Sequence, residues 1–464
     1  MRAHALLAWA CASAAGAGTL WSGHDITLEG RAFYKVLGTG VRLSPGLVLT
    51  AAELERILDE ARVESGGAPN ASGGLVLPGA GGSTGHVARL EGKATWKELL
   101  EVDLAYELDA VMASNPAFVG GPTLSTTLTG AEGGAPQRRL VDLPATLYST
   151  PGLIVTENLD RFSVRLSTRH ADVVIGRQVL SWGTGRFWNP TDLLSPFPPT
   201  QVDREVRRGI DAVRVTAPLS KTAQLEMLWL PRKVAAENGG ALRVQGNLYG
   251  YDLSLSAAKY VDDLVLGADF SGDAGPAGLH GEAAYTWGLT GLGEPGAPVG
   301  VGERALRAVV GVDLKPTEKL ALSAEYSFNG FGAADPSGYL AVLTSPRARR
   351  GEIFGAGRHY AGVAATYAFT ELLNAQLLAI VNLQDPSAQL LPVLEYWFEQ
   401  SVILRAVAFL PLGPAPDPSA LRGLHGSAGV ASPVFQQTLS TLGLRSEFGL
   451  ASYGAALQVG IYFQ

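Results

Sequence analysis

The last stretch of the chain, Tyr453-Gly454-Ala455-Ala456-Leu457-Gln458-Val459-Gly460-Ile461-Tyr462-Phe463-Gln464, alternates two kinds of side chain up to its final residue. One set is mostly large and apolar, and the other is mostly small or polar. A period of two residues predicts an extended strand with one apolar face. The same alternation recurs along most of the chain, for example in Glu318 to Phe328 and in Leu99 to Ala110.

Composition limits how these apolar faces can be used. Of 464 residues, 17% are charged and 57 are glycine. No stretch approaches the ~20 consecutive apolar residues that a membrane helix needs. An apolar chain without such a helix must bury its apolar side chains in a core or turn them toward lipid on a closed barrel. The net charge of −7, with no basic tract, argues against a nucleic-acid partner.

The N-terminus predicts a secretory signal peptide over residues 1–17. Arg2 precedes a short apolar run over 5–12 and small residues over 13–18, with cleavage expected near Ala15 or Ala17. Cys11 is the only cysteine, and it would leave with this peptide. A lipid-anchored Cys11 is the alternative, and the short apolar run argues against it. Without a thiol, the mature chain is not a disulfide-stapled domain.

The fold class that we predict is all-β, a single transmembrane antiparallel β-barrel of about 18 strands, with 16 as the alternative count. It would occupy residues 18–464. A soluble sandwich also alternates, but strands of about 9 to 12 residues suit tilted membrane strands better than globular ones. The predicted strands are 25–36, 84–91, 98–110, 161–169, 171–181, 209–217, 222–230, 248–258, 261–270, 278–289, 304–314, 318–328, 359–369, 372–383, 388–398, 401–411, 440–449 and 453–464.

Connections between these strands are unequal in length, as expected of short turns at one end of a barrel and long loops at the other. Strict alternation of long and short fails near 258–304 and again after 370. A short helix is expected from Ala51 to about Val63, capped by Thr50. It would plug the lumen, cap one mouth, or lie as a solvated loop helix. The long connections are 37–83, 111–160, 182–208, 231–247, 329–358 and 412–439.

Residues 176–214 differ from the remainder of the chain. They contain Gly176-Arg177-Gln178, Trp182-Gly183-Thr184-Gly185-Arg186 and Ser195-Pro196-Phe197-Pro198-Pro199, followed by a basic cluster before the next strand. The Trp-Gly-x-Gly turn and the prolines predict a non-repetitive loop. The alternation lapses where Arg177 and Gln178 adjoin, so one of them breaks the in-and-out rule.

This stretch resembles outer-membrane barrels of the capsule-assembly (Wzi-like) and exopolysaccharide-secretion type, and a wider set of Gram-negative porin-like barrels. The resemblance covers about forty residues. It implies a barrel of about 18 strands at the surface of a Gram-negative bacterium, in polysaccharide passage or attachment. Its partners would be outer-membrane lipid, surface polysaccharide and periplasmic export components. The chain differs from these barrels by its extra loop at 37–83 and by ending on Gln464.

Charged side chains on the polar strand faces predict a wet or charge-paired lumen. On a lipid face each arginine would cost up to ~2–4 kcal/mol. Arginines opposite carboxylates would orient hydrated solutes, or they would brace a closed barrel through internal salt bridges. The candidate residues of the lumen or its constriction are Arg177, Trp182, Arg186, Arg204, Arg207, Arg208, Arg214, Arg161, Arg165, Glu101, Asp103, Glu226 and Glu282.

Enzymes are not expected, because the histidines are scattered singly and none lies in a Gly-x-Ser-x-Gly elbow or a His-Glu-x-x-His helix. No cofactor or metal is expected either. The predicted function is a porin-like outer-membrane channel for passage or export of a hydrophilic substrate such as a surface polysaccharide. The alternatives are a general diffusion porin and a non-conducting structural, adhesion or motility barrel.

Overall fold

Twenty strands in the described part of the chain form a single antiparallel sheet. The computed structural model describes residues 18–23, 25–42, 80–114, 139–150, 152–201, 203–289, 304–343, 345–398, 400–415, 444–450 and 453–463. The strands are β1 (Gly18–Ser22), β2 (Ile26–Arg42), β3 (Ala80–Trp96), β4 (Leu100–Ala113), β5 (Ala145–Thr150), β6 (Leu153–Ser167), β7 (Asp172–Gln178), β8 (Ile210–Pro218), β9 (Ala223–Leu230), β10 (Gly239–Leu248), β11 (Tyr251–Tyr260), β12 (Asp263–Ala274), β13 (Ala277–Gly288), β14 (Arg304–Leu314), β15 (Leu320–Asn329), β16 (His359–Ala368), β17 (Leu373–Asn382), β18 (Ser387–Phe398), β19 (Val402–Leu412) and β20 (Tyr453–Phe463).

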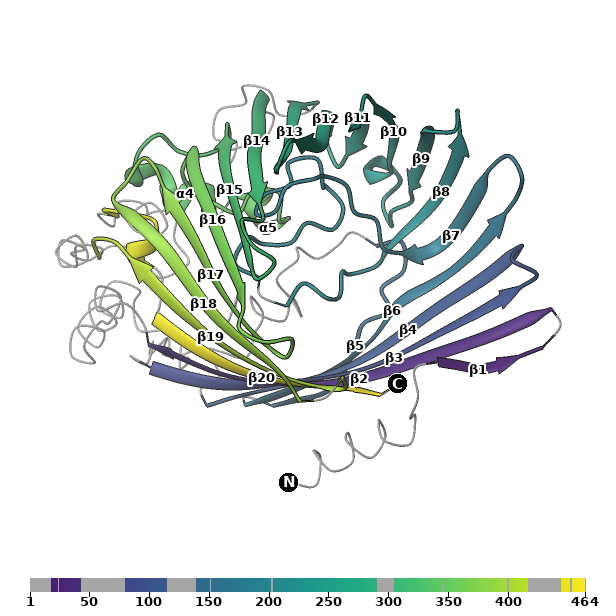
Figure 1. Ribbon diagram of the computed structural model, residues 1–464, viewed down its shortest axis with the longest axis horizontal. Coiled ribbons are helices and arrows are strands. Elements are labelled where there is room, and N and C mark those ends of the chain that lie inside the picture. Colours follow the sequence, from purple (N-terminus) through teal and green to yellow (C-terminus); the bar gives the residue numbers. More distant parts are fainter. Residues whose placement is uncertain are drawn as a thin grey trace, which may run out of the picture.

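The sheet closes on itself through its last strand. β20 pairs with β2, from Ala32 opposite Phe463 to Arg42 opposite Tyr453. The short strands β1 and β5 pair only with parts of β2 and β6, and the remaining strands form a closed 18-strand ring (Figure 1). The predicted antiparallel barrel, closed by its final strand, is therefore confirmed.

Two errors in the predicted strands cancel in this count. β10 was placed in a loop, because Gly239, Gly240 and Gly246 interrupt a short alternating pattern. Residues 440–449 were predicted as a strand, but β19 pairs directly with β20 and leaves no place for another. The described part of that segment is coil followed by the 3-10 turn η5 (Phe448–Leu450). Leu444 packs in a buried cluster with Tyr339 and Ala356.

With the strands placed correctly, the connections divide between the two ends of the barrel. One end of the barrel carries the short turns 97–99, 168–171, 219–222, 249–250, 275–276, 315–319, 369–372 and 399–401, together with the C-terminal end of β20. We call this the short-turn end. The opposite end carries the longer connections, with 261–262 and 383–386 as two short exceptions. The connection 330–358 contains η4 (Pro336–Gly338), α4 (Tyr339–Leu343) and α5 (Pro346–Arg349), and 231–238 contains η3 (Ala235–Glu237).

Two predicted features lie outside the described residues. The signal peptide over 1–17 is one, and the helix from Ala51 to Val63 is the other. Among the helices that the structure does describe, none is long and apolar enough to cross a membrane.

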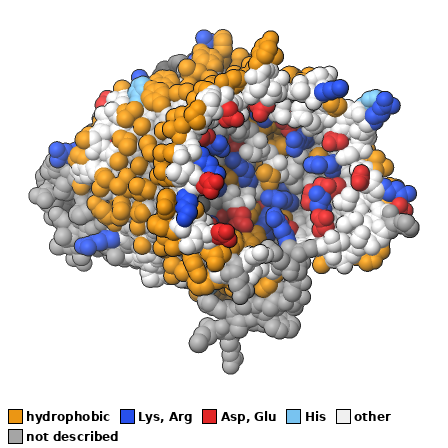
Figure 2. All heavy atoms as spheres, in the orientation of Figure 1, with side chains coloured by type: hydrophobic (Ala, Val, Ile, Leu, Met, Phe, Trp, Pro, Cys, Tyr) orange, Lys and Arg blue, Asp and Glu red, His pale blue; other side chains and the backbone are white. Residues whose placement is uncertain are grey.

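The outer face of the ring is apolar. Leu255 in the middle of β11 is 68% exposed, while its neighbour Ser254 is buried inside the barrel. Exposed Ile175, Leu242 and Val310 repeat this arrangement on other strands. Figure 2 shows apolar side chains over the outer surface and charged ones in the hollow that the strands enclose. An apolar outside around a charged inside is the arrangement of a barrel embedded in lipid.

This orientation predicts the cost of a charge on each face. Leu255→Arg should destabilise the folded barrel by about 2–4 kcal/mol, because it places an arginine among lipid tails. Thr216→Arg is the matched control, since Thr216 lies opposite Glu226 on the inner face. Its effect should stay within about 0.5 kcal/mol. Urea unfolding in lipid vesicles measures the free energy of unfolding of both variants. Equal losses of stability in Leu255→Arg and Thr216→Arg would contradict the assignment of these residues to the outer and inner faces.

Candidate functional site

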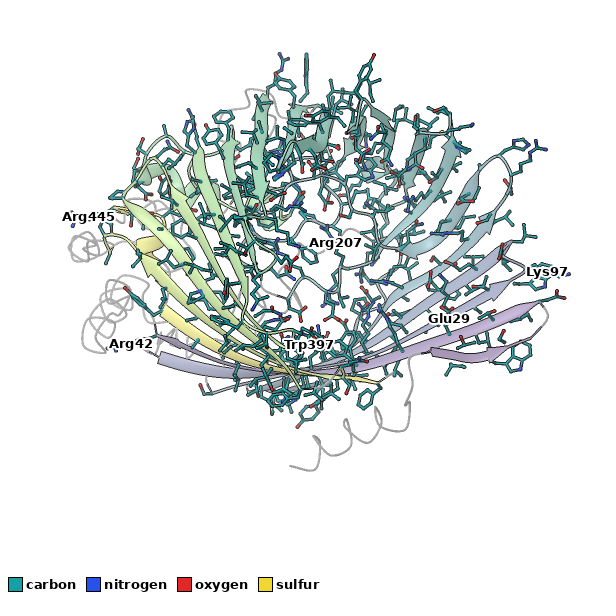
Figure 3. The ribbon with its side chains drawn as sticks, in the orientation of Figure 1. Glu29, Arg42, Lys97, Arg207, Trp397 and Arg445 are labelled. Carbon is teal, nitrogen blue, oxygen red and sulfur yellow. The ribbon has the colours of Figure 1, made fainter. Side chains whose placement is uncertain are left out.

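The connection between β7 and β8 crosses the inside of the barrel. We call residues 179–201 and 203–209 the lumen loop. In Figure 1 it runs through the space framed by the strands, and Figure 3 places Arg207 near the centre of the ring. Its side chains and backbone contact β2, β4, β9, β13, β15 and β20. The loop therefore determines what space remains in the lumen.

The Trp-Gly-Thr-Gly turn enters the lumen because its glycines permit close approach. Gly183 has φ +96°, and a Cβ there would lie 2.6 Å from a carboxylate oxygen of Glu282. A Cβ on Gly185 would collide with the backbone oxygen of Trp188. Left-handed φ and the absence of a side chain are both conditions that glycine satisfies.

Glu282 on β13 anchors this turn through backbone amides. Its carboxylate accepts hydrogen bonds from the amides of Thr184 at 2.5 Å, Gly185 at 2.6 Å and Thr191 at 3.2 Å. It also accepts from the Thr191 hydroxyl at 2.8 Å. Hydrogen bonds to a charged acceptor are the stronger kind, so one inward carboxylate fixes both ends of a short turn.

Glu325 on β15 anchors the next residues in the same way. Its carboxylate accepts from the amides of Arg186, of Phe187 at 3.0 Å and of Trp188 at 3.4 Å. Its other neighbour is His280, whose Nε2 lies 2.8 Å from Glu325 Oε1. The Arg186 guanidinium then pairs with Asp313 at 2.9 Å. The loop is thus attached to two adjacent parts of the wall.

Trp182 and the arginines of the neighbouring wall form a third contact. The buried Trp182 donates its indole N–H to Glu226 at 3.0 Å, and Glu226 also pairs with Arg214 at 2.6 Å. The guanidinium of Arg243 lies 5.7 Å from the Trp182 ring centre. The structure therefore brings together three of the candidate residues, Trp182, Glu226 and Arg214.

The middle of the lumen loop is held by its own charges. Arg207 pairs with Asp192, donates to the Ser195 carbonyl at 2.7 Å and lies over the Phe197 ring at 4.3 Å. Burial raises the pKa of Asp192, and the opposing effect of Arg207 does not fully offset it. Within the described part of the chain, the hydrogen bonds that Arg204 donates go to backbone carbonyls, among them those of Gln201 at 3.0 Å and Pro199 at 2.8 Å. These arginines therefore shape the loop.

The return leg of the loop is anchored on the opposite wall. Lys35 on β2 contacts Asp203 at 2.7 Å and Glu205 at 2.5 Å. Gln458 on β20 donates to Asp203 at 2.9 Å, and Tyr462 donates to Glu205 at 2.7 Å. Burial acts to raise the pKa of Asp203. Lys35 and the hydrogen bond from Gln458 together lower this pKa by more than burial raises it, so the net shift is downward.

The lowered pKa of Asp203 predicts a pH dependence for this anchor. A depressed carboxyl pKa stabilises the folded state above the unfolded pKa of about 3.9, and this contribution is lost as pH falls through the folded pKa. The wild-type chain should therefore melt at a higher temperature than Asp203→Asn by a constant margin from pH 7 to about 5, narrowing only below about pH 4. If the difference in melting temperature disappeared between pH 7 and 5, Lys35 would not be holding the pKa of Asp203 down.

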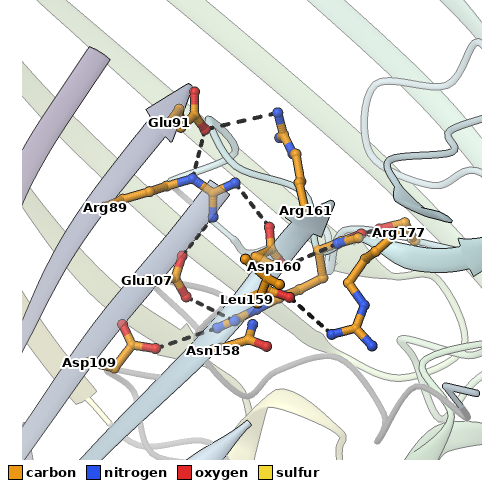
Figure 4. Close-up of polar contacts among 12 residues, drawn as sticks. Arg89, Glu91, Glu107, Asp109, Asn158, Leu159, Asp160, Arg161 and Arg177 are labelled. Atoms are coloured by element: carbon orange, nitrogen blue, oxygen red, sulfur yellow. Dashed lines mark hydrogen bonds and ion pairs between the residues drawn. The ribbon is translucent and has the colours of Figure 1, made fainter. Parts of the chain in front are cut away.

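Arg208 connects the lumen loop to a buried charge cluster on the wall. Figure 4 shows this cluster around Arg89, Glu107 and Asp160. Arg208 contacts Glu107 at 2.9 Å and Asp109 at 4.0 Å on β4. The fully buried Arg89 reaches Glu91 at 2.7 Å, Glu107 at 2.9 Å and Asp160 at 3.0 Å. Opposite charges compensate each other here, as buried charges require.

Arg177 lies in the wall itself. It pairs with Asp211 at 2.8 Å and donates to the carbonyls of Leu159 at 3.0 Å and Val141 at 2.5 Å. Gly176, at φ +117°, interrupts the alternation, so that Arg177 lies opposite the exposed Phe162 while Gln178 is buried against Ala212. Arg177 therefore joins β6, β8 and segment 139–143 where the ladder between β6 and β7 stops.

The other candidate residues lie on the inner wall near the short-turn end. Glu101 pairs with Lys93 at 2.9 Å and lies opposite Arg165 in the strand register. Arg161 approaches Glu91 at 3.9 Å. Asp103 shares the inner face of β4 with Glu101. None of the contacts described for these four residues reaches the lumen loop.

Part of the inner wall is apolar, which the alternating charges did not predict. Phe187 and Trp188 of the lumen loop pack against Leu37, Tyr360, Leu378, Ile380, Leu391, Val393, Val407 and Phe409 from inside the barrel. Leu180, Trp182, Leu193 and Leu194 pack against β8 to β13 in the same way. Strands β16 to β19 therefore carry apolar residues on both faces. Their outer face is exposed on the barrel surface, and part of their inner face packs against the lumen loop.

Lys35, Asp203, Glu205 and Glu325 were not among the candidate residues, although each anchors the lumen loop. The acidic residues inside the loop and the single lysine on β2 were visible in the sequence. Their pairing spans 168 and 170 residues along the chain, and no local pattern indicates it.

A hydrophilic hollow of about 540 Å³ lies beside the lumen loop toward the short-turn end. It is lined by Thr184 of the loop and by residues of β9, β10, β11, β12 and turn 219–222. Across the described ranges, no group of three or more His, Cys, Asp or Glu side chains is placed to hold a metal ion.

No protein-family model and no curated protein matches the chain. Solved barrels do. Pseudomonas aeruginosa OccK5 (OpdH) is 9% identical at a TM-score of 0.48, covering 94% of this chain and 98% of that one. Acinetobacter baumannii OccAB3 is 11% identical at a TM-score of 0.49, and the match covers 94% of this chain and 99% of that one. A Rhodopseudomonas blastica porin mutant is 10% identical at a TM-score of 0.41, and the match covers 94% of this chain and 100% of that one. At such identities and TM-scores, these similarities say nothing about which solute this chain would transport.

Proposed function

We propose that the protein is a porin-like channel of a Gram-negative outer membrane, which admits small hydrophilic solutes past a fixed lumen loop. The observation that carries the proposal is a closed barrel, apolar outside, whose charged interior is crossed by a loop anchored on opposite walls. Such a loop narrows a barrel without moving, and the hydrophilic hollow beside it supplies space for hydrated solutes.

The two ends of the barrel support an orientation. Outer-membrane barrels place short turns in the periplasm and long loops outside the cell. The short-turn end, where β20 also ends, would therefore face the periplasm. The hollow would then open toward the periplasm, because residues of turn 219–222 line it.

Passage of a surface polysaccharide stays a prediction from the resemblance. Within the described residues, the lumen loop and the apolar packing around Phe187 and Trp188 fill part of the barrel, which favours small solutes over a polymer. A second candidate is a non-conducting scaffold. The dense pairing of the loop charges, including Lys35 with Asp203 and Arg208 with Glu107, would also brace a closed barrel.

Planar-bilayer recording separates the two. The purified full chain should give steady single-channel currents in salt, and vesicles containing it should swell in small sugars but not in dextran. Silence in the bilayer, with the protein folded and inserted, would reject the channel and favour the scaffold. Loss of surface polymer in a deletion strain, with unchanged small-solute uptake, would instead favour polymer passage.

A further inference from the structure

The hollow beside the lumen loop is lined mainly by polar side chains. Half of its lining residues carry neutral amide or hydroxyl groups, and four are charged, namely Lys221, Arg243, Asp252 and Asp269. The neutral groups are Thr184, Ser220, Thr222, Gln224, Gln245, Asn247, Ser254 and Ser271. A volume of about 540 Å³ lies within the range of small-molecule sites.

The strand register arranges part of this lining in one row around the wall. Gln224 lies opposite Gln245, and Gln245 lies opposite Ser254. Ser254 lies in turn opposite Asp269. Neighbouring strands are about 4.8 Å apart, so the row presents hydrogen-bonding groups at regular spacing. Each amide supplies two donors and an acceptor oxygen.

The charges of the row are already paired. Arg243 contacts Asp269 at 3.2 Å and donates to the Ser254 hydroxyl at 3.1 Å. Ser254 also donates to Asp269. The side-chain amides of Gln224 and Gln245 make no hydrogen bond to any residue that the structure describes. Both side chains are half-buried. Lys221 and Asp252, the other charged residues of the lining, are exposed beside the turns 219–222 and 249–250. Along the row itself, the groups left to bind a solute are neutral donors and acceptors.

We propose that this hollow is a binding site for a neutral polyhydroxylated solute, a small sugar or polyol, held by the amides of Gln224 and Gln245. The proposal rests on the proposed channel, of which it would be the periplasmic-side solute site. An amide donates to one hydroxyl of a vicinal pair and accepts from the next. Beside the two amides, Arg243 and Asp269 already satisfy each other's charge, so this part of the lining favours a neutral solute.

Equilibrium binding tests the site without relying on transport. Saturation-transfer NMR on the full chain in detergent, with raffinose as the probe, should show transfer to the sugar. The double variant Gln224→Leu and Gln245→Leu should weaken raffinose binding about tenfold, because two neutral hydrogen bonds are lost. The matched control is Gln376→Leu, a half-buried amide on the inner face of β17, far from the hollow.

Four outcomes are distinguishable. Weaker binding in the double variant and unchanged binding in Gln376→Leu would support the site. Equal raffinose binding by all three proteins, or none by the wild type, would overturn it. If the site binds raffinose while the bilayer stays silent, the channel fails and the sugar site stands. If ions pass and raffinose does not bind, the channel stands and the sugar site fails.

Discussion

Arg89→Met should lower the free energy of unfolding by about 3–5 kcal/mol, because it removes a buried cation that three carboxylates share. Arg89 is fully buried and contacts Glu91, Glu107 and Asp160 within 3.0 Å. Methionine keeps most of the side-chain volume but removes the charge and the N–H donors that bind Glu91 and Glu107. Urea unfolding in vesicles, or the temperature at which the folded band disappears on a gel, measures the loss.

Arg31→Met is the matched control for Arg89. Arg31 pairs with the same Glu91, but its side chain is 60% exposed. An exposed ion pair contributes about 0–1 kcal/mol. A loss as small in Arg89→Met as in Arg31→Met would show that the cluster in Figure 4 is solvated and does not brace the wall.

Glu282→Ala combined with Glu325→Ala should release residues 184–191 of the lumen loop from the wall while the barrel remains folded. Glu282 accepts four hydrogen bonds from the loop, and Glu325 accepts three. Each bond to a carboxylate is worth about 1.5–3 kcal/mol. Hydrogen exchange at the amides of residues 184–188 should therefore accelerate at least about 100-fold. The single-channel current should also become larger and noisier.

Glu101→Ala is the control for this pair of changes. Glu101 is an inward carboxylate of the same barrel, and its described partner is Lys93, outside the lumen loop. Exchange at residues 184–188 should not change in this variant. Unchanged exchange in the double variant as well would mean that packing of Phe187 and Trp188 holds the loop without the two carboxylates.

The barrel itself was predictable because the pattern that indicates it lies within each strand. Alternation along each strand indicates an apolar and a polar face, as in β20 and β15, and the strand lengths exclude most sandwiches. The errors were local too. The glycines of β10 mask a strand, and the alternating residues near Leu444 imitate one. The count of 18 was correct because one error offset the other.

The lumen loop was predictable only as a special segment. Trp182, Gly183 and Gly185 marked it in the sequence, and the candidate residues included Glu282, which anchors it. Its path could not be derived, because the path depends on contacts such as Asp203 with Gln458, 255 residues apart. The position of Arg177 in the wall depends on the left-handed backbone of Gly176, which alternation does not reveal.

The central claim is that the lumen loop lies against the inner wall of a closed barrel, and one cross-linking measurement tests it most directly. Val206 of the loop and Val87 of β3 line the same small cavity. With Cys11 replaced by serine, Val87→Cys and Val206→Cys should join through a short bifunctional thiol reagent in the folded barrel and not after unfolding. Ser323→Cys with Ala364→Cys, opposite each other on β15 and β16, checks the chemistry. Joining of both pairs is the predicted result. Joining of the control pair alone would contradict a loop inside the barrel.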